Sequence, residues 1–160
     1  MKKLIFLLIG VAVVSQGCLN SSDECDNCNN PPALFGFTLL PTETGTSLIP
    51  DVYKLDTIYL YYLEGSVKKN VELRYANSMY LGTYLLSTDI SVVSAGKNVK
   101  TFYLYLNKQD TDTIYFDCKL ANDGCCTYYR YDSLSYNGRK MLYHPASGLR
   151  YMLKPQNEGK

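Results

Sequence analysis

The sequence predicts an all-β fold, a single antiparallel β-sandwich of the immunoglobulin-like or a similar kind, with about eight or nine strands. Beyond Leu34, apolar residues alternate with a period of two, which is typical of strands and not of helices. Turn residues recur roughly every eight to twelve positions, the spacing expected for a sandwich. The chain also contains 16 tyrosines and no tryptophan, and tyrosine is favoured in strands.

Each predicted strand is a short alternating run bounded by turn residues. Hairpin turns are expected at residues 122–124 and at Asn137-Gly138, because asparagine, aspartate and glycine tolerate a positive φ. Another turn is expected at 145–148, and residues 79–86 fit either a strand or a short helix. The expected strands span residues 35–39, 56–62, 71–75, 102–106, 114–120, 126–131, 134–136, 140–143 and 149–153.

The start of the chain has the pattern of a secretory leader. Lys2 and Lys3 precede an apolar run over residues 4–14, which fits a signal-peptide core and is too short to span a bilayer. Small or polar residues then lead to Cys18, and polar and acidic residues follow it directly. The alternatives are an ordinary signal peptide with a coincidental cysteine, and a buried core helix.

The dipeptide Gly17-Cys18 resembles the lipobox of bacterial lipoproteins, in which the cysteine becomes the lipidated N-terminus. Ser15 departs from the leucine that is common at that place, and this relaxed form is similar to lipoboxes of the Bacteroidota. In that group an acidic stretch after the cysteine resembles a surface-export signal, and residues 22–24 fit it. The resemblance implies a signal peptide over residues 1–17, palmitate-type acylation of Cys18, and an outer-membrane lipoprotein exposed at the cell surface.

Composition divides the rest of the chain into a tether and a domain. Residues 18–33 are rich in Asn, Ser, Asp and Pro and predict a flexible tether, and residues 34–160 are expected to form the β-sandwich. The net charge is only +1, and loss of the two leader lysines makes it slightly negative. Neither value favours nucleic acid. The expected partners are the membrane, through the lipid anchor, and an unknown protein or glycan; no cofactor is expected.

Five cysteines remain besides Cys18, and in an exported protein disulfides are the default. An odd count leaves one over. Cys118 is in phase with Phe116 and with Leu120, which predicts a buried thiol. Cys125 and Cys126 must face opposite sides of a strand, so at most one of them can meet Cys118. We therefore expect disulfides from the tether pair to the hairpin pair, with the candidate residues Cys25, Cys28, Cys125 and Cys126.

Two alternatives for these cysteines stay open. The spacing Cys25-x-x-Cys28 is that of redox motifs, although these need a helix N-terminus beside the first cysteine. The tether and hairpin pairs also have the ligand types of a four-thiolate zinc site, but adjacent residues reach one ion poorly, so no metal is expected. An N-terminal cysteine pair, the segment 112–116 and a late vicinal pair together resemble small uncharacterised Bacteroidota lipoproteins. This resemblance covers scattered motifs and implies no activity.

No catalytic residue is expected. The single histidine, His144, precedes Pro145 in a predicted turn without a nucleophile beside it in the pattern. Asp110 and Asp112 lack the spaced oxygen ligands of a calcium loop, so a solvated loop is the better interpretation. The leading functional prediction is an envelope-anchored binding or structural module that is not an enzyme. The alternatives are an envelope glycan hydrolase and a pilus-like surface assembly subunit.

Two surface features are candidates for function. Thr57, Tyr59 and Tyr61 share one face of their predicted strand, as do Tyr103 and Tyr105 of another. If the two strands are neighbours, the tyrosines form an aromatic patch able to bind a protein or glycan. Alternatively, they simply cover a sandwich face or fill the core.

Short Asp-Ser/Thr-apolar segments resemble the O-glycosylation sequon of exported Bacteroidota proteins. They begin at Asp56, Asp112 and Asp132, and an aspartate before a β-branched residue is also how a strand begins. The candidate glycosylation residues are Thr57, Thr113 and Ser133.

Overall fold

The computed structural model describes residues 28, 31–124 and 126–155. The chain divides into two units. The first consists of residues 1–30 with Asn122–Thr127, and the second of Pro31–Ala121 with residues 128–160. The predicted leader, Cys18 and most of the predicted tether lie outside the described residues.

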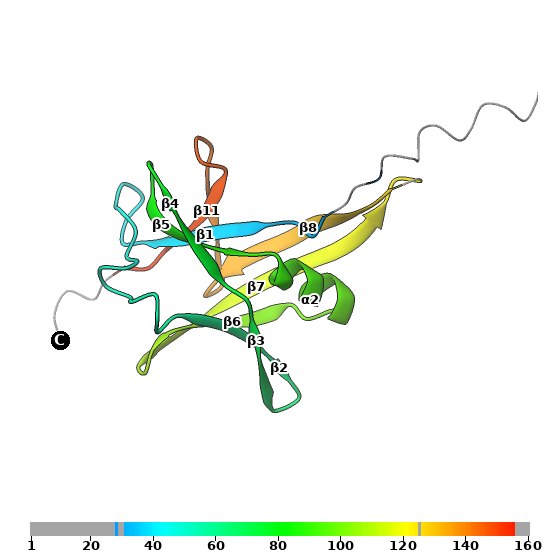
Figure 1. The fold of residues 1–160 in the computed structure, drawn as a ribbon, viewed down its shortest axis with the longest axis horizontal. Helices are drawn as coiled ribbons and strands as arrows, with labels where there is room; N and C mark the ends of the chain where they lie inside the picture. The colour runs from blue at the N-terminus through cyan, green and yellow to red at the C-terminus, as the bar shows by residue number, and fades with distance from the viewer. Residues whose placement is uncertain (1–27, 29–30, 125, 156–160) are drawn as a thin grey trace, which may run out of the picture. The chain divides into compact units, whose positions relative to one another are not determined.

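Eleven strands and one helix are present in the described part of the chain (Figure 1). The helix is α2 (Asp89–Lys97). The strands are β1 (Phe35–Leu40), β2 (Tyr59–Glu64), β3 (Val67–Val71), β4 (Arg74–Ser78), β5 (Gly82–Ser87), β6 (Thr101–Asn107), β7 (Asp110–Asn122), β8 (Thr127–Tyr136), β9 (Arg139–Lys140), β10 (Leu142–His144) and β11 (Leu149–Leu153).

The strands form two sheets that pack together. One sheet has the order β10-β11-β1-β5-β4, and the other has the order β3-β2-β6-β7-β8-β9. The all-β prediction is therefore confirmed. The expectation of purely antiparallel pairing is wrong, because β1 and β11 lie parallel, with Phe37 opposite Arg150 and Leu40 opposite Leu153. The number of strands also exceeds the expected eight or nine, since several short edge strands carry no clear alternation.

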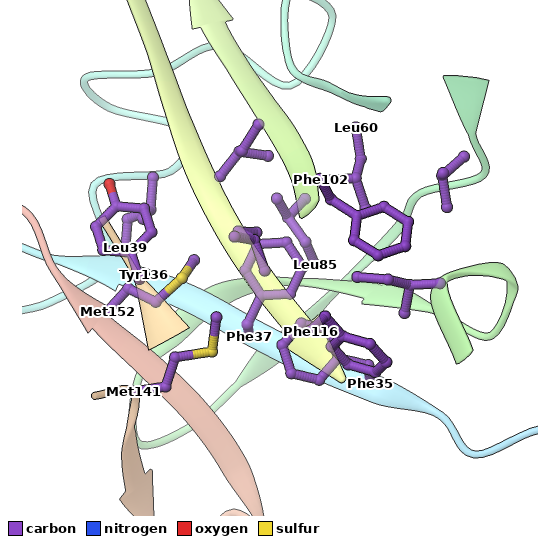
Figure 2. Packing of buried hydrophobic residues seen from close by; sticks show 14 of the residues in the cluster. Phe35, Phe37, Leu39, Leu60, Leu85, Phe102, Phe116, Tyr136, Met141 and Met152 are labelled. Carbon is purple, nitrogen blue, oxygen red and sulfur yellow. The ribbon is translucent and has the colours of Figure 1, made fainter. Parts of the chain in front are cut away.

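The core lies between the sheets and combines aliphatic side chains with a group of aromatic rings (Figure 2). Phe116 of β7 is fully buried, and its ring contacts Phe35 of β1 edge-on at a centroid distance of 4.9 Å. It also lies 6.1 Å from Phe102 and 5.3 Å from Tyr131, again in edge-on geometry. Such contacts add to the stabilisation from apolar burial alone. Phe116 therefore joins both sheets near the centre of the core.

The two predicted hairpins are present. β8 and β9 pair with Tyr136 opposite Arg139, so Asn137 and Gly138 form a two-residue turn. Their φ values are 47° and 75°, the left-handed conformations that this turn type requires. The other hairpin joins the neighbouring strands β7 and β8, and its loop contains Gly124 with a φ of 105°. Both turns could be predicted because their residues tolerate a positive φ.

Several predicted boundaries are wrong. The expected strand over residues 71–75 straddles a break, because β3 ends at Val71 in one sheet and β4 begins at Arg74 in the other. Asp110 and Asp112 belong to β7 and not to a solvated loop. Leu120 does not share the buried face with Cys118, since 53% of its surface is exposed. Both Lys119 and Leu120 of β7 are exposed, so alternation stops predicting burial beyond Cys118.

Residues 76–98, for which the sequence favoured no single structure, contain β5 and α2. The helix has poor intrinsic propensity, because it includes β-branched residues, serines and Gly96. Tertiary contacts hold it instead. The Ser91 hydroxyl donates to the carbonyl of Ala33 at 2.7 Å, the Ser94 hydroxyl donates to that of Phe116 at 2.9 Å, and Ile90 is fully buried. Asn98 ends the helix in the left-handed conformation, with a φ of 54°.

Candidate functional site

The predicted aromatic patch is assembled by the pairing of β2 with β6. Tyr59 lies opposite Tyr105, and Tyr61 lies opposite Tyr103. The rings of both pairs are stacked, with centroid distances of 4.5 Å and 5.2 Å. The alternate residues of these strands, such as Leu60, are fully buried in the core, so the four tyrosines lie on the outward face of the six-stranded sheet. We call this set the tyrosine face.

Within the tyrosine face the rings cover part of one another's surface, because they are in contact. Tyr59 contacts Tyr61 at 5.8 Å in addition to its stacked partner on β6. Lys68 of β3 places its Nζ 4.7 Å from the centroid of the Tyr61 ring, a cation–π contact. Tyr61 is consequently buried, whereas Tyr59 and Tyr103 are half-buried. The face is a preformed aromatic layer in which Tyr59, Tyr103 and Tyr105 keep part of their surface exposed.

The three candidate glycosylation residues differ in accessibility. Thr57 precedes β2, so it is not part of the tyrosine face as the sequence suggested. It is exposed, with its hydroxyl 2.8 Å from the carbonyl oxygen of Lys54. Ser133 is exposed on β8, and Thr113 is half-buried opposite Tyr103.

A polar cluster that the sequence did not reveal lies where β7 begins. Lys154, just after β11, places its Nζ 2.8 Å from Asp110 Oδ1 and 2.6 Å from Asp112 Oδ2. The Tyr53 hydroxyl donates to Asp110 Oδ2 at 2.8 Å. Tyr136 donates through its hydroxyl to Asp112 Oδ2, and Asn137 donates through Nδ2 to Asp112 Oδ1 at 2.8 Å. All four carboxylate oxygens are thus hydrogen-bonded within the protein.

Burial and charge shape the protonation of this cluster. Burial lowers the pKa of Lys154, but its hydrogen bonds to Asp110 and Asp112 outweigh this effect, and the net pKa is raised. Burial, together with the hydrogen bond to Asp112, raises the pKa of Tyr136 far above its ordinary value. Tyr136 therefore remains a hydrogen-bond donor at any physiological pH. The sequence showed that Asp110 and Asp112 are close together in the chain. It gave no sign that Lys154 contacts them, because Lys154 lies far along the chain.

The first unit contains the disulfide of the described residues. Cys28 and Cys126 are bonded, with a Cα–Cα distance of 5.4 Å and a sequence separation of 98. This is one of the tether-to-hairpin pairings that the sequence predicts. Since both thiolates are consumed by the bond, neither is available as a ligand for the alternative zinc site. Cys25 and Cys125 lie outside the described residues.

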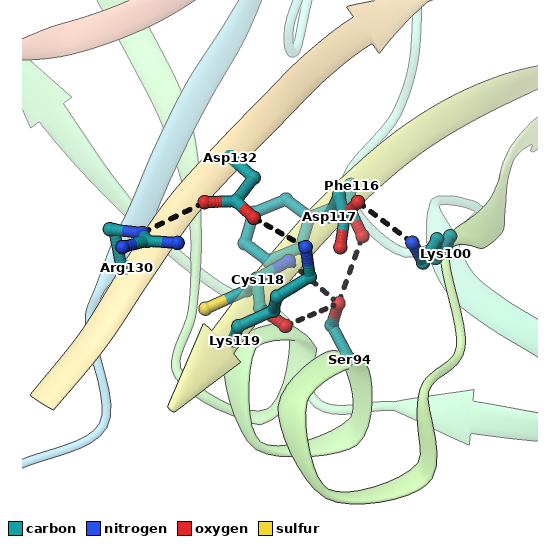
Figure 3. Close-up of polar contacts among 8 residues, drawn as sticks. All are labelled: Ser94, Lys100, Phe116, Asp117, Cys118, Lys119, Arg130 and Asp132. Atoms are coloured by element: carbon teal, nitrogen blue, oxygen red, sulfur yellow. Dashed lines mark hydrogen bonds and ion pairs between the residues drawn. The ribbon is translucent and has the colours of Figure 1, made fainter. Parts of the chain in front are cut away.

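Cys118 is the free cysteine of the described chain, and it is buried (Figure 3). Its backbone N–H donates to the Ser94 hydroxyl at 3.0 Å, which holds α2 against β7. Burial raises the pKa of the thiol, with a smaller contribution from Asp132. A raised pKa reduces the thiolate population, and the thiolate is the reactive form. Cys118 therefore has the character of an inert core residue.

Charged side chains beside Cys118 form ion pairs with one another (Figure 3). Asp132 accepts hydrogen bonds from Lys119 at 2.6 Å and from Arg130 at 2.9 Å, and both lower its pKa. Lys100 donates to Asp117 at 2.8 Å. Because every one of these charges has an opposite charge beside it, this group of residues does not present a charged binding patch.

His144 lies at the end of β10, in the turn that leads to β11. Its Nδ1 is 3.0 Å from the hydroxyl oxygen of Ser147, so a potential nucleophile is nearer than the sequence suggested. The Ser147 hydroxyl oxygen also accepts a hydrogen bond from the backbone N–H of Leu149 at 3.4 Å, within the same turn. In the described chain no carboxylate hydrogen-bonds to the ring, as an acid–base–nucleophile arrangement requires. The contact is that of a turn.

Comparison with protein-family models, with curated proteins and with solved structures finds no match to this chain. Among residues 28, 31–124 and 126–155, no helix is long and apolar enough to cross a membrane. The same residues contain no group of three or more His, Cys, Asp or Glu side chains placed to hold a metal ion.

Proposed function

We propose that this chain is an exported lipoprotein, anchored to the outer membrane through acyl chains on Cys18, whose β domain binds a protein partner at the cell surface. In this proposal the two sheets form a single immunoglobulin-like sandwich that serves as the scaffold. The tyrosine face is the binding surface. The observation that carries this role is the pairing of β2 with β6, which aligns four tyrosines on one outward sheet face.

The geometry of the tyrosine face favours a protein over a glycan. Stacked rings such as Tyr59 and Tyr105 already have little rotamer freedom, so a partner that binds them causes a smaller loss of side-chain entropy. Tyrosine is also enriched at the centres of protein interfaces. A sugar ring binds best over an open aromatic face, whereas here the rings turn faces toward one another.

The two alternative functions have less support. A glycan hydrolase needs carboxyl groups that reach the substrate. The closely spaced pair Asp110 and Asp112 instead directs its oxygens to Lys154, to Asn137 and to tyrosine hydroxyls. A pilus-like subunit that accepts a donated strand needs a vacant place in a sheet, and the position between β11 and β5 is filled by β1 of the same chain.

The anchor is tested by replacing the proposed lipidation residue. We expect the Cys18→Ala variant to lose acyl mass and to leave the membrane fraction, because a doubly or triply acylated residue supplies enough buried methylene groups for stable attachment. A Cys118→Ala variant is the control and should remain in the membrane fraction. Retention of the Cys18→Ala variant after an alkaline wash would contradict the anchor.

The binding surface is tested by site-specific photo-cross-linking in the native envelope. With a photoreactive phenylalanine in place of Tyr103, we expect one discrete cross-linked protein adduct. Tyr75, which is 64% exposed on β4 of the other sheet, is the matched control position and should give none. A second replacement, Tyr105→Ser, should reduce the adduct at least tenfold by disrupting the stacked layer. Equal cross-linking from both positions, or none from Tyr103, would refute the tyrosine face as the binding surface.

A further inference from the structure

Lys154 and Asp112 lie in a geometry that suits covalent chemistry as well as an ion pair. The Lys154 Nζ is 2.6 Å from Asp112 Oδ2, and the two residues are 42 positions apart. We propose that Lys154 and Asp112 condense into an intramolecular amide bond, which cross-links the end of β11 to the beginning of β7. This proposal does not depend on the binding role of the tyrosine face.

Asp112 has the surroundings of an electrophile. Its side chain is 7% exposed, and both of its oxygens accept hydrogen bonds from uncharged donors, the Tyr136 hydroxyl and the Asn137 amide. Donors aimed at a carboxyl group stabilise the negative charge that develops on oxygen when a nucleophile adds to its carbon. These two donors come from the β8–β9 hairpin, so the fold fixes them in place before any reaction.

Asp110 has the position of a base for the amine. Its Oδ1 is 2.8 Å from Lys154 Nζ, and its side chain is 26% exposed, more than that of Asp112. The Tyr53 hydroxyl donates to its other oxygen at 2.8 Å, which holds the carboxylate in place beside the amine. The two carboxylates therefore differ in role, one accepting the proton of the amine and the other accepting the amine itself.

The reaction balances without any further reactant. The Lys154 ammonium gives one proton to Asp110, and the resulting amine adds to Cγ of Asp112. The nitrogen then loses a second proton. This proton, the proton held by Asp110 and one oxygen of Asp112 leave together as a water molecule. One N–C bond forms, one C–O bond breaks, and Asp110 returns to its carboxylate form. A cavity of 320 Å³ bordered by Lys154, Tyr136 and Asn137 gives the water a path out.

Two physical effects favour the amide over the ion pair. Holding two reactants in contact is equivalent to an effective concentration of up to about 10⁵–10⁸ M, which compensates for the unfavourable condensation of free amines and carboxylates in water. The amide itself is also neutral, so the buried Asp112 no longer carries a charge whose desolvation is costly, while the carboxylate of Asp110 keeps the hydrogen bond from the Tyr53 hydroxyl. The ion pair is the precursor in which the protein first folds.

The test is tryptic mapping of the folded full chain. Trypsin cleaves after Lys108, Lys119 and Arg150 but not between Lys154 and Pro155, so the two reacting residues lie in peptides 109–119 and 151–160. We expect these peptides to be recovered joined, with a mass 18 Da below their sum, the mass of one water. Recovery of both as separate peptides at full mass from the folded protein would overturn the proposal.

Three controls make the result specific. A loss of 18 Da also arises from succinimide formation at Asp123-Gly124, but that modification does not join the two peptides. The Lys154→Arg variant keeps the positive charge, and circular dichroism should show it folded, with both peptides separate. Asp110→Asn keeps the size of the side chain but removes the base, so cross-linking should slow about 100-fold. An unchanged rate in Asp110→Asn would overturn the assignment of Asp110 as the base.

Discussion

Removal of the Cys28–Cys126 disulfide should lower the free energy of unfolding by about 4–5 kcal/mol in a chain whose Cys25 and Cys125 are replaced by serine, because a bond between those two cysteines would close a loop of nearly the same length. The bond joins residues 98 positions apart, and on the chain-entropy model a loop of this length restricts the unfolded chain strongly. The double variant Cys28→Ser/Cys126→Ser is the proper test, because a single replacement leaves a thiol that can pair with another cysteine. Equilibrium urea unfolding at neutral pH measures the change.

The free thiol of Cys118 provides a comparison for this experiment. Because Cys118 is unpaired and buried and this background has serine at positions 25 and 125, adding a reductant to the double variant should change its stability much less than adding it to the chain that keeps the Cys28–Cys126 bond. A loss below about 1 kcal/mol in the double variant would show that the disulfide does not constrain the unfolded state as this argument requires.

Replacement of Phe116 by alanine should destabilise the fold by about 3–5 kcal/mol. The side chain is fully buried and its ring contacts aromatic rings from both sheets, so truncation leaves a cavity that neither sheet can close alone. Thermal and urea unfolding of the purified domain measure the loss.

Leu120→Ala is the matched control, since it truncates another large apolar residue of the same strand. Leu120 is 53% exposed, and the expected change is within about 0.5 kcal/mol. A cost for Leu120→Ala comparable to that of Phe116→Ala would contradict the boundary between buried and exposed β7.

Local chemistry explains why much of the fold could be predicted. Alternation in β1 and β6 identified Phe37, Phe102 and Leu104 as core residues, because side chains of a strand point to opposite faces in turn. The Asn137-Gly138 turn followed from its tolerance of positive φ. The buried free thiol of Cys118 agrees with its phase in the strand, and the link from the tether to the hairpin agrees with an argument from cysteine count, export and side-chain direction.

The sequence did not predict the features of the fold that depend on contacts between distant parts of the chain. The helix α2 has a composition that disfavours helices, and it is held by hydrogen bonds from Ser91 and Ser94 to backbone carbonyls elsewhere in the chain. The parallel pairing of β1 with β11 joins segments more than a hundred residues apart. Turn residues indicate which adjacent strands pair, and they do not indicate a pairing of this kind. These features could not be predicted, because local patterns carry no information about pairing across such separations.

The two candidate sites illustrate the same division. The sequence by itself determined the residues of the tyrosine face and the phase that turns them outward, since alternation is a local property of each strand. Only the tertiary structure decided that β2 and β6 are neighbours, and so that Tyr59 meets Tyr105. It alone also placed Lys154 against Asp110 and Asp112, which turned two acids expected in a solvated loop into a bonded cluster. The physical reason is that contacts between distant segments are set by the packing of the whole core, whereas the conformation of each strand and turn is set by its own residues.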